Sequence, residues 1–266
     1  RGRRQAGVDM QAPSDFKIIY GASQAEGANM PVAFVVGSHP ADAIAAVSMA
    51  PAQDDFGLIG ALRNAAVPKV KCVTSDLYVP ADAELVLEGY LHAEGWTEPE
   101  GPFGEYVGYY GKLKQNPVFH LTAITHRENM LFQTATIGGR YMENTDTAQI
   151  CTLRSEATAW AALQTAVREP LAIYVTASSG GMYNARLAIN QRVPGEARNA
   201  IAAVLGSMAD IKHLFVVDGD IDIFSDAQMD WALATRFQAD RDLVISTGYR
   251  AVPLDPSLEG ERTGAK

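Results

Sequence analysis

The pattern of apolar positions predicts that the first half of the chain is mostly β-structure. Apolar runs typical of strands recur along it, at residues 16–20, 31–37, 70–75 and 84–91. The run at residues 84–91 places apolar side chains on both faces, which predicts a strand inside a sheet. Two longer runs, residues 117–125 and 130–137, are separated by four polar residues and predict an antiparallel hairpin. Helical spacing over residues 41–49 and 55–63 predicts two short helices.

The second half changes to alternating strands and helices. Apolar side chains recur at helical spacing over residues 148–167, which predicts a helix long enough to link two domains. Beyond it, strands are predicted at residues 171–177, 185–190, 213–218 and 243–246, and helices at residues 196–209 and 227–237. This alternation favours a mainly parallel sheet covered by helices. We therefore expect domains over residues 1–147 and 169–266, with a linker helix over residues 148–168.

Composition predicts a folded protein with an acidic surface. With 266 residues, 47% of them hydrophobic, the chain can bury a core that needs neither disulfides nor a structural zinc. Lys and Arg number 22 against 31 Asp and Glu, so the net charge of −9 disfavours nucleic acid as a partner. No run approaches the ~20 apolar residues of a membrane span. We expect a cytoplasmic protein whose two cysteines, Cys72 and Cys151, are free and buried.

Several familiar motifs are missing or fail on inspection. There is no phosphate-binding P-loop and no dinucleotide-binding glycine pattern after a strand. Residues 178–181, Ser-Ser-Gly-Gly, favour a plain turn. Residues 218–222, Asp-Gly-Asp-Ile-Asp, lack the Gly and Glu that an EF-hand needs, so we expect acids at a strand end that cap the next helix. His120 and His126 could share one face of a strand, where a structural role is favoured over a catalytic one.

The strongest local signal is the sequence Glu-Gly-Pro-Phe-Gly-Glu at residues 100–105, referred to below as the acid loop. Its glycines permit unusual φ angles and its proline fixes one, so the loop can bend Glu100 and Glu105 into one cleft. Phe103 and the residue after the loop, Tyr106, would supply apolar walls of that cleft. Two acids in a cleft of low dielectric cannot both ionise easily, so one keeps its proton and can donate it. An acidic surface turn is the alternative interpretation.

Segments around this loop resemble the UbiD family of prenylated-FMN-dependent decarboxylases. The resemblance is carried by residues 79–90 (Val-Pro-Ala-Asp-Ala-Glu-Leu-Val-Leu-Glu-Gly-Tyr), 100–105 and 108–110 (Gly-Tyr-Tyr). Shorter matches at residues 60–63, 70–72, 218–222, 231–232 and 253–256 extend it over nearly the whole chain. The resemblance implies an α+β and α/β protein: a split β-barrel flavin-binding domain, a linker helix and a C-terminal three-layer α/β oligomerisation domain.

The resemblance also implies an activity and two catalytic residues. Family members decarboxylate aromatic, heteroaromatic or α,β-unsaturated carboxylic acids through a covalent adduct with prenylated FMN, releasing CO₂. Glu105 matches the family's proton donor, and Glu100 matches the carboxylate that pairs with an arginine at the substrate. The flavin is the electron sink for the carbanion, and an acid returns a proton to the same carbon. A flavin prenyltransferase would supply the cofactor, and a homodimer or homohexamer is expected.

Cofactor and metal residues are likewise implied by the resemblance alone. In the family a divalent metal, commonly Mn²⁺, with K⁺ beside it, holds the phosphate of the flavin. The Glu and His ligand positions match Asp55 and Asp15, both departures in residue type. Ser48 and Met49 match the cofactor and potassium loop, and Lys212 matches a lysine that contacts the cofactor. The family's Asn-Trp-Ser segment, with its metal-binding Asn and its Arg, is expected upstream, so we expect this sequence to be a fragment.

Two other functions stay open on the sequence. The Asp replacements at the metal positions and the missing Arg favour a non-catalytic subunit of a multi-component carboxylase. A flavin-independent hydrolase using the same carboxylate pair has neither a nucleophile nor an orienting histidine in its favour.

Overall fold

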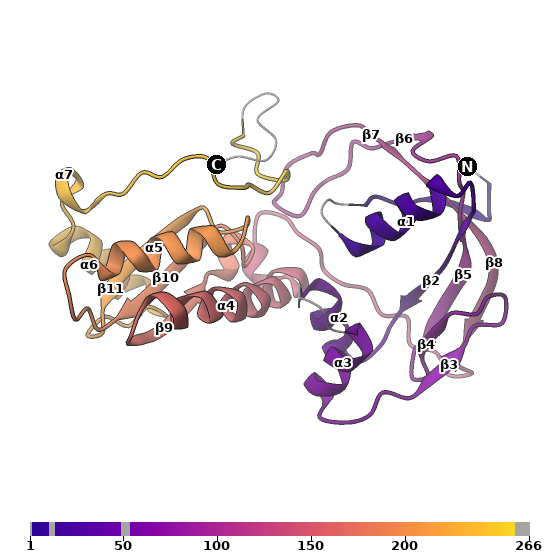
Figure 1. Cartoon of the computed structure of the whole chain (residues 1–266), viewed down its shortest axis with the longest axis horizontal. Helices are drawn as coiled ribbons and strands as arrows, with labels where there is room; N and C mark the ends of the chain where they lie inside the picture. The colour runs from indigo at the N-terminus through magenta and orange to yellow at the C-terminus, as the bar shows by residue number, and fades with distance from the viewer. Residues whose placement is uncertain (1, 11–13, 49–53, 259–266) are drawn as a thin grey trace. The chain divides into compact units, whose positions relative to one another are not determined.

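The computed structural model describes residues 2–10, 14–48 and 54–258, and its elements are shown in Figure 1. The chain divides into two compact units. The first comprises Arg1–Phe103 and Tyr110–Thr134, and the second comprises Gly104–Tyr109 and Ala135–Lys266. The boundary therefore crosses the acid loop, directly after Phe103.

The first unit is built on a four-stranded antiparallel sheet with the order β1-β8-β5-β2. Its elements are β1 (Gln5–Gly7), α1 (Asp15–Ala25), β2 (Met30–Val36), α2 (Pro40–Val47), α3 (Asp55–Arg63), β3 (Lys69–Lys71), β4 (Tyr78–Pro80), β5 (Leu85–Leu91), β6 (Glu98–Glu100), β7 (Lys114–Asn116) and β8 (Val118–His126). Strand β5 lies between β2 and β8, which confirms the prediction that it is internal. The pairs β3-β4 and β6-β7 form separate two-stranded antiparallel ladders.

Helix α1 replaces the strand that was predicted at residues 16–20. The Ser14 side chain accepts a hydrogen bond from the Lys17 N–H and so caps the helix N-terminus. Phe16 and Tyr20, one helical turn apart, pack on the sheet core, and the Tyr20 hydroxyl donates to the His92 carbonyl at 2.6 Å. The apolar run is therefore the buried stripe of a helix, with its other apolar residues exposed.

The predicted hairpin at residues 117–137 is wrong in its second half. Strand β8 forms as expected, but residues 131–138 belong to no strand. Strand β8 pairs with β5 along most of its length and with β1 at Val118–His120, and residues 131–138 add no further ladder to it. The segment instead makes side-chain contacts: the Leu131 N–H donates to Glu84, and the Gln133 side chain accepts from the Ser38 N–H.

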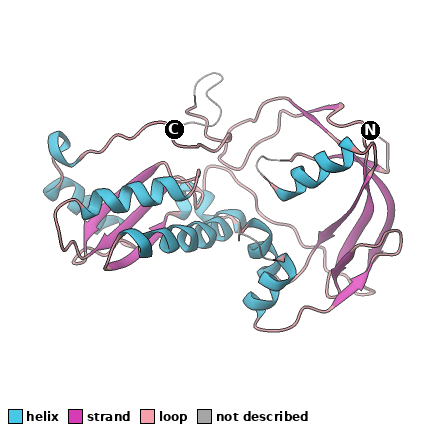
Figure 2. Ribbon diagram, in the orientation of Figure 1, coloured by secondary structure: helices cyan, strands magenta, loops and turns pink. Residues whose placement is uncertain are grey.

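The second unit is a mixed three-stranded sheet, with the order β11-β10-β9, between helices. Its elements are η1 (Met142–Asn144), α4 (Asp146–Ala166), β9 (Pro170–Val175), η2 (Ala177–Ser179), β10 (Asn184–Ile189), α5 (Glu196–Ser207), β11 (His213–Asp218), α6 (Asp226–Arg236) and α7 (Ala239–Asp242), with helices and strands coloured in Figure 2. Strands β10 and β11 are parallel, but β9 and β10 are antiparallel, so the mainly parallel prediction is wrong. The short connection between β9 and β10 cannot provide a crossover. Residues 243–246 form no strand.

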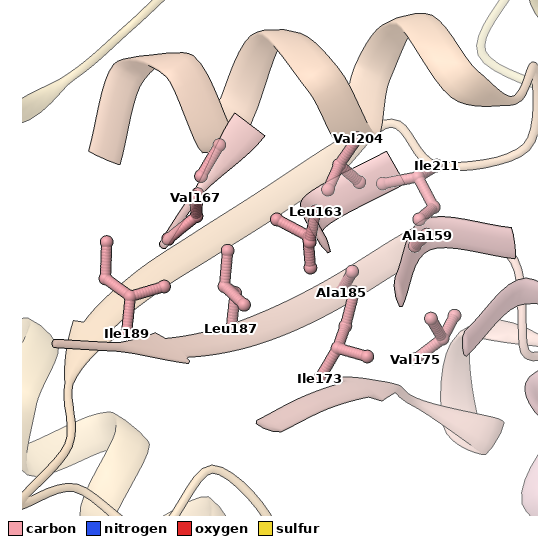
Figure 3. Close-up of a cluster of buried hydrophobic side chains, with 11 residues drawn as sticks. Ala159, Leu163, Val167, Ile173, Val175, Ala185, Leu187, Ile189, Val204 and Ile211 are labelled. Atoms are coloured by element: carbon pink, nitrogen blue, oxygen red, sulfur yellow. The ribbon is translucent and has the colours of Figure 1, made fainter. Parts of the chain in front are cut away.

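Helices cover both faces of this sheet. One face packs on α4 and α5 through an apolar cluster in which Leu187 and Ile189 of β10 lie near Leu163 and Val167 of α4 (Figure 3). On the other face, Ala188 of β10 belongs to a second cluster with residues of α6 and the loop before it. The mixed α/β class is thus confirmed. The described sheets do not close into a barrel, so the split barrel stays a prediction.

Two further expectations can be checked against the described residues. Cys72 is free and buried, and Cys151 is free and half-buried. None of the described helices combines the length and the apolar character needed to cross a membrane.

Candidate active site

Glu100 is the last residue of β6, in the first unit, and its carboxylate is oriented by a buried amide. In the β6-β7 ladder Glu100 lies opposite Lys114. Two residues further along β7, the Asn116 side-chain amide donates to Glu100 Oε2 at 2.7 Å. Asn116 is only 2% exposed, so its amide is held firmly in place. The carboxylate is therefore fixed by local structure rather than free to rotate in solvent.

The turn after Glu100 requires glycine. Gly101 has φ +100°, and a Cβ added there would lie 3.1 Å from the Lys112 carbonyl. The Gly101–Pro102 peptide is cis. On the other side of the turn the Phe103 carbonyl accepts from the Gly111 N–H at 2.9 Å. Three large apolar side chains near this turn, all in the first unit, are exposed: Phe103, Tyr110 and Leu113.

Glu105 belongs to the second unit, within a turn closed on itself. Its N–H donates to the Tyr109 carbonyl at 2.7 Å, and its carbonyl accepts from the Gly108 N–H at 2.9 Å. The next two residues, Tyr106 and Val107, are both buried in an apolar cluster of the second unit. Glu105 is thus attached directly to residues anchored in that unit's core.

Tyr106 is the anchor of this turn. Its side chain, 6% exposed, packs with Met182 and Val252, and its hydroxyl has no hydrogen-bond partner in the described part of the chain. Burial, and secondarily the neighbouring Cys151 thiol, raises the pKa of Tyr106 well above its usual range. The phenol therefore stays protonated and neutral at any physiological pH.

The Glu100 carboxylate is held within the first unit, and the backbone of Glu105 is held within the second. The prediction that Glu100 and Glu105 meet in one cleft is neither confirmed nor contradicted by these contacts. It stays a prediction.

The residues predicted to contact the cofactor have local partners. Ser48 ends α2, where its N–H donates to the Ala45 carbonyl at 3.0 Å and its hydroxyl to the Ile44 carbonyl at 2.6 Å. Met49 lies outside the described residues.

Lys212, in the second unit, is engaged with an acidic residue. Its ammonium group donates to Asp255 at 2.9 Å and also to the Ser257 hydroxyl. Burial alone would raise the pKa of Asp255, but the hydrogen bonds from Lys212 and Ser257 lower it on balance. A phosphate group would therefore have to compete with Asp255 for this lysine.

The two predicted metal ligands both begin helices. Asp55 is the first residue of α3 and Asp15 the first of α1, and both are exposed. A negative charge in a first helical turn is favourable without any metal, because it faces the positive end of the helix dipole. No three His, Cys, Asp or Glu side chains gather into a metal-binding group among the described residues. The described side chains therefore do not fit a metal centre by themselves, and no reaction step is assigned to a metal.

Acidic residues of the segment 79–90 have structural roles that the sequence did not reveal. Arg63 donates to both oxygens of Asp42, at 2.6 and 2.5 Å, and to Asp82 at 2.7 Å. This triad joins α2 and α3 to the turn after β4.

Glu88 on β5 is the most deeply buried acid of the segment, at 1% exposed. It accepts hydrogen bonds from the Val73 N–H at 3.0 Å, the Thr74 N–H at 2.7 Å and the Thr74 hydroxyl at 2.8 Å. Burial alone would raise the pKa of Glu88, but these three hydrogen bonds together lower it below its usual value. An acid inside an otherwise apolar strand was the signal that could have identified it.

The remaining motifs are structural. Asp220 forms a paired hydrogen bond with the Arg236 guanidinium, at 2.8 and 2.5 Å, and Ser225 caps α6. The prediction that the acids at residues 218–222 cap that helix is therefore wrong, because Ser225 lies closer to its N-terminus. The turn at residues 178–181 is confirmed. His120 stacks on Tyr90, with ring centroids 5.0 Å apart.

A groove of about 990 Å³ runs along β11 between α5 and α6 of the second unit. Lys212 lines it, but neither Glu100 nor Glu105 does. The groove is thus separate from the acid loop.

Taken together, the fold and the loop define a class: a two-unit α/β protein whose acid loop supplies one carboxylate from each unit. Two family models match the chain, the UbiD 3-octaprenyl-4-hydroxybenzoate carboxy-lyase Rift-related domain over residues 1–141 and the corresponding C-terminal domain over residues 148–266. The chain belongs to the UbiD family.

Similar proteins include enzymes of this family. The anhydromevalonate phosphate decarboxylase of Aeropyrum pernix is 31% identical over 257 residues, covering 96% of this chain and 57% of that protein. Its counterpart in Methanosarcina mazei is 28% identical, covering 100% of this chain and 61% of that protein. The structure of HmfF from Pelotomaculum thermopropionicum in complex with FMN matches with a TM-score of 0.91 and 33% identity, covering 100% of this chain and 57% of that one. This chain therefore spans less than two thirds of the length of each.

Proposed function

We propose that this chain belongs to a prenylated-FMN-dependent carboxy-lyase that decarboxylates an aromatic, heteroaromatic or α,β-unsaturated carboxylic acid. The observation that carries the proposal is the acid loop itself, with Glu100 oriented by Asn116 and Glu105 anchored through Tyr106. Membership of the UbiD family supports it, as does the similarity to HmfF, whose structures hold FMN and, in an evolved dimeric form, prFMN. Anhydromevalonate phosphate, from the names of the relatives, is one candidate substrate.

In this proposal each carboxyl group has a separate task. The bound flavin would supply the electron sink for the carbanion left when CO₂ departs. Glu105 would deliver a proton to the carbon that lost CO₂. Glu100, held by Asn116, would present an oriented carboxylate toward the reacting substrate.

The exposed apolar side chains near Glu100 support the binding of a planar ring, because Phe103, Tyr110 and Leu113 leave an uncovered apolar surface. Ser48 and Lys212 would contact the cofactor only by exchanging or sharing their present partners. Mn²⁺ and K⁺ would need further ligands, because no group of three His, Cys, Asp or Glu side chains forms among the described residues. A split-barrel flavin domain over residues 1–147, a linker helix, an α/β domain over residues 169–266 and assembly into a homodimer or homohexamer are part of the same proposal.

The test uses the protein at its full natural length, coexpressed with a flavin prenyltransferase. Glu105→Gln should lower kcat by about 10²- to 10⁴-fold, the usual contribution of a general acid, while the visible flavin spectrum is unchanged. Glu128→Gln, an exposed acid in the turn after β8, is the matched control.

Near wild-type turnover in Glu105→Gln would show that the role assigned to Glu105 is wrong. A colourless, metal-free and inactive wild-type protein would favour the non-catalytic subunit. That second candidate is motivated by Asp55 and Asp15, which stand where the family has Glu and His.

A further inference from the structure

The Gly-Gly turn after β9 packs directly against Tyr106. Gly180 and Gly181 adopt φ +79° and +65° at the end of the short helix η2. A Cβ added to Gly180 would lie 2.9 Å from the Tyr106 hydroxyl and 3.1 and 3.2 Å from two of its ring carbons. The tyrosine ring therefore occupies the space that any side chain at position 180 would need.

The turn itself is held rigidly. The Gly181 N–H donates to the Thr176 carbonyl at 3.0 Å, and the Ser155 hydroxyl of α4 donates to the Gly181 carbonyl at 2.8 Å. A Cβ on Gly181 would overlap the α4 backbone at Ala148. Gly181 is thus clamped to the first half of α4, and Gly180 beside it forms a fixed wall.

The main chain of Tyr106 is held as well. A Cβ on Gly138 would overlap the Tyr106 carbonyl group, and the Gly139 N–H donates to the same carbonyl at 3.3 Å. Tyr106 is therefore restrained at its backbone by residues 138–139 and at its ring by Gly180. A push on the ring therefore acts on a side chain with little room to yield, and its backbone continues directly into Glu105.

We infer that Gly180 is a positioning residue for the proton donor, acting on Glu105 through the ring of Tyr106. This inference rests on the proposed role of Glu105. Proton transfer to carbon needs the donor at hydrogen-bond reach of its target, and displacement of about 1 Å costs on the order of 10²-fold in rate. The glycine turn sets that distance without touching the substrate.

Gly180→Ala tests the inference, with Gly195→Ala as its matched control. Gly195 also has a positive φ, +92°, but a Cβ there meets no atom within 4 Å. The two substitutions impose similar backbone strain, and only Gly180→Ala presses on Tyr106. In the full-length holoprotein we expect Gly180→Ala to lower kcat by about tenfold or more, with KM and flavin content unchanged. Gly195→Ala should keep kcat within about twofold of wild type, because it moves no neighbour.

Two further readouts separate positioning from a general structural effect. Adding Tyr106→Phe to Gly180→Ala removes the atom nearest the new methyl group and should restore part of kcat. A misplaced donor makes proton return slower, so the solvent deuterium isotope effect on kcat should rise in Gly180→Ala alone. If Gly180→Ala does not accumulate as folded protein, Tyr106→Leu is the second variant, because it removes the ring beside Gly180 without adding atoms. It should give the same loss of kcat, with the flavin retained.

Wild-type kcat in folded Gly180→Ala or in Tyr106→Leu would overturn the inference, as would equal losses in Gly180→Ala and Gly195→Ala. Such results leave the proposed function standing if Glu105→Gln is inactive. An active Glu105→Gln would instead remove the role assigned to Glu105, and with it the basis of this inference, while the decarboxylase activity would stand.

Discussion

Asn116, a buried side chain on β7, donates its amide hydrogen to Glu100 across the β6-β7 ladder at 2.7 Å. The hydrogen bonds at Phe103 and Glu105 act on the backbone of the acid loop. The hydrogen bond from Asn116 acts on a proposed catalytic carboxylate directly, so its loss should be visible in the kinetics.

Asn116→Leu should lower kcat/KM by about 10- to 100-fold, because a hydrogen bond to a charged group contributes about 1.5–3 kcal/mol. Leucine has a similar volume, so packing changes little. Steady-state kinetics on the flavin-loaded protein measure the effect. Gln115→Leu, the exposed neighbour on the same strand, should leave kcat/KM unchanged. Equal effects of the two substitutions would mean that strand β7, and not the amide, matters.

Glu88→Gln should destabilise the first unit by about 1–3 kcal/mol at neutral pH, the cost of disturbing buried hydrogen bonds to a charged group. The folded-state pKa of Glu88 lies below its usual value of 4.5, so its contribution is present above pH 4.5. That contribution is lost as the pH falls further, through the folded-state pKa.

Denaturant unfolding at pH 7 and at pH 3 measures this linkage. The stability gap between wild type and Glu88→Gln should be largest at pH 7 and should shrink at about pH 3. Glu94→Gln, an exposed acid, supplies the control. A gap that does not change with pH would contradict the account given for Glu88.

Arg63→Ala should cost about 2–4 kcal/mol of stability, because it leaves the Asp42 carboxylate buried without its partner. This loss of stability is smaller than the loss expected for a fully buried triad, because Asp82 is partly exposed. Lys71→Ala removes an ion pair with the exposed Asp76 and should leave stability nearly unchanged. Unfolding midpoints of the two variants compare a buried with an exposed pair in one protein. A similar loss in both would contradict the importance of the triad.

Lys212→Met should destabilise the second unit, since Asp255 keeps a buried charge without its ion pair. If Lys212 also contacts the flavin phosphate, flavin content should fall in the variant. Asp255→Asn separates the two roles, because it removes the charged partner of Lys212 while the lysine keeps its hydrogen bond to the neutral Ser257 hydroxyl. Flavin content should then be retained or raised in Asp255→Asn. Equal flavin loss in both variants would exclude a direct lysine–phosphate contact.

The pattern of apolar residues predicted those helices and strands whose secondary structure is determined by their own sequence. Strand β5 and helices α3 and α4 form close to their predicted positions because their apolar periodicity was unambiguous. Residues 16–20 were misassigned because a short apolar run fits a helix stripe as well as a strand. Residues 130–137 were predicted as a strand on their apolar run alone, but the structure holds them through contacts with residues distant in the sequence, such as the Leu131 N–H with Glu84.

The same division holds for the candidate site. Glu100 and Glu105 could be singled out because glycine and proline between them mark a special backbone. Tyr106 was expected only as an apolar wall of the cleft. The roles that the structure shows for Asn116, Tyr106 and Gly180 could not be predicted, since each depends on a partner distant in the sequence: a cross-strand neighbour, a core cluster and a loop packed against a ring. Such roles follow from register and packing, which local composition does not encode.

The two units are joined within the acid loop, so the length of the loop limits the distance between Glu100 and Glu105. Five residues of fully extended backbone span at most ~18 Å, so the α-carbons of Glu100 and Glu105 can never be further apart than this. One glycine inserted after Phe103 would increase this maximum distance. It would leave in place the hydrogen bond from Asn116 to Glu100 and the packing of Tyr106 beside Glu105. If Glu105 is the proton donor, as proposed, proton delivery should be the first step to slow.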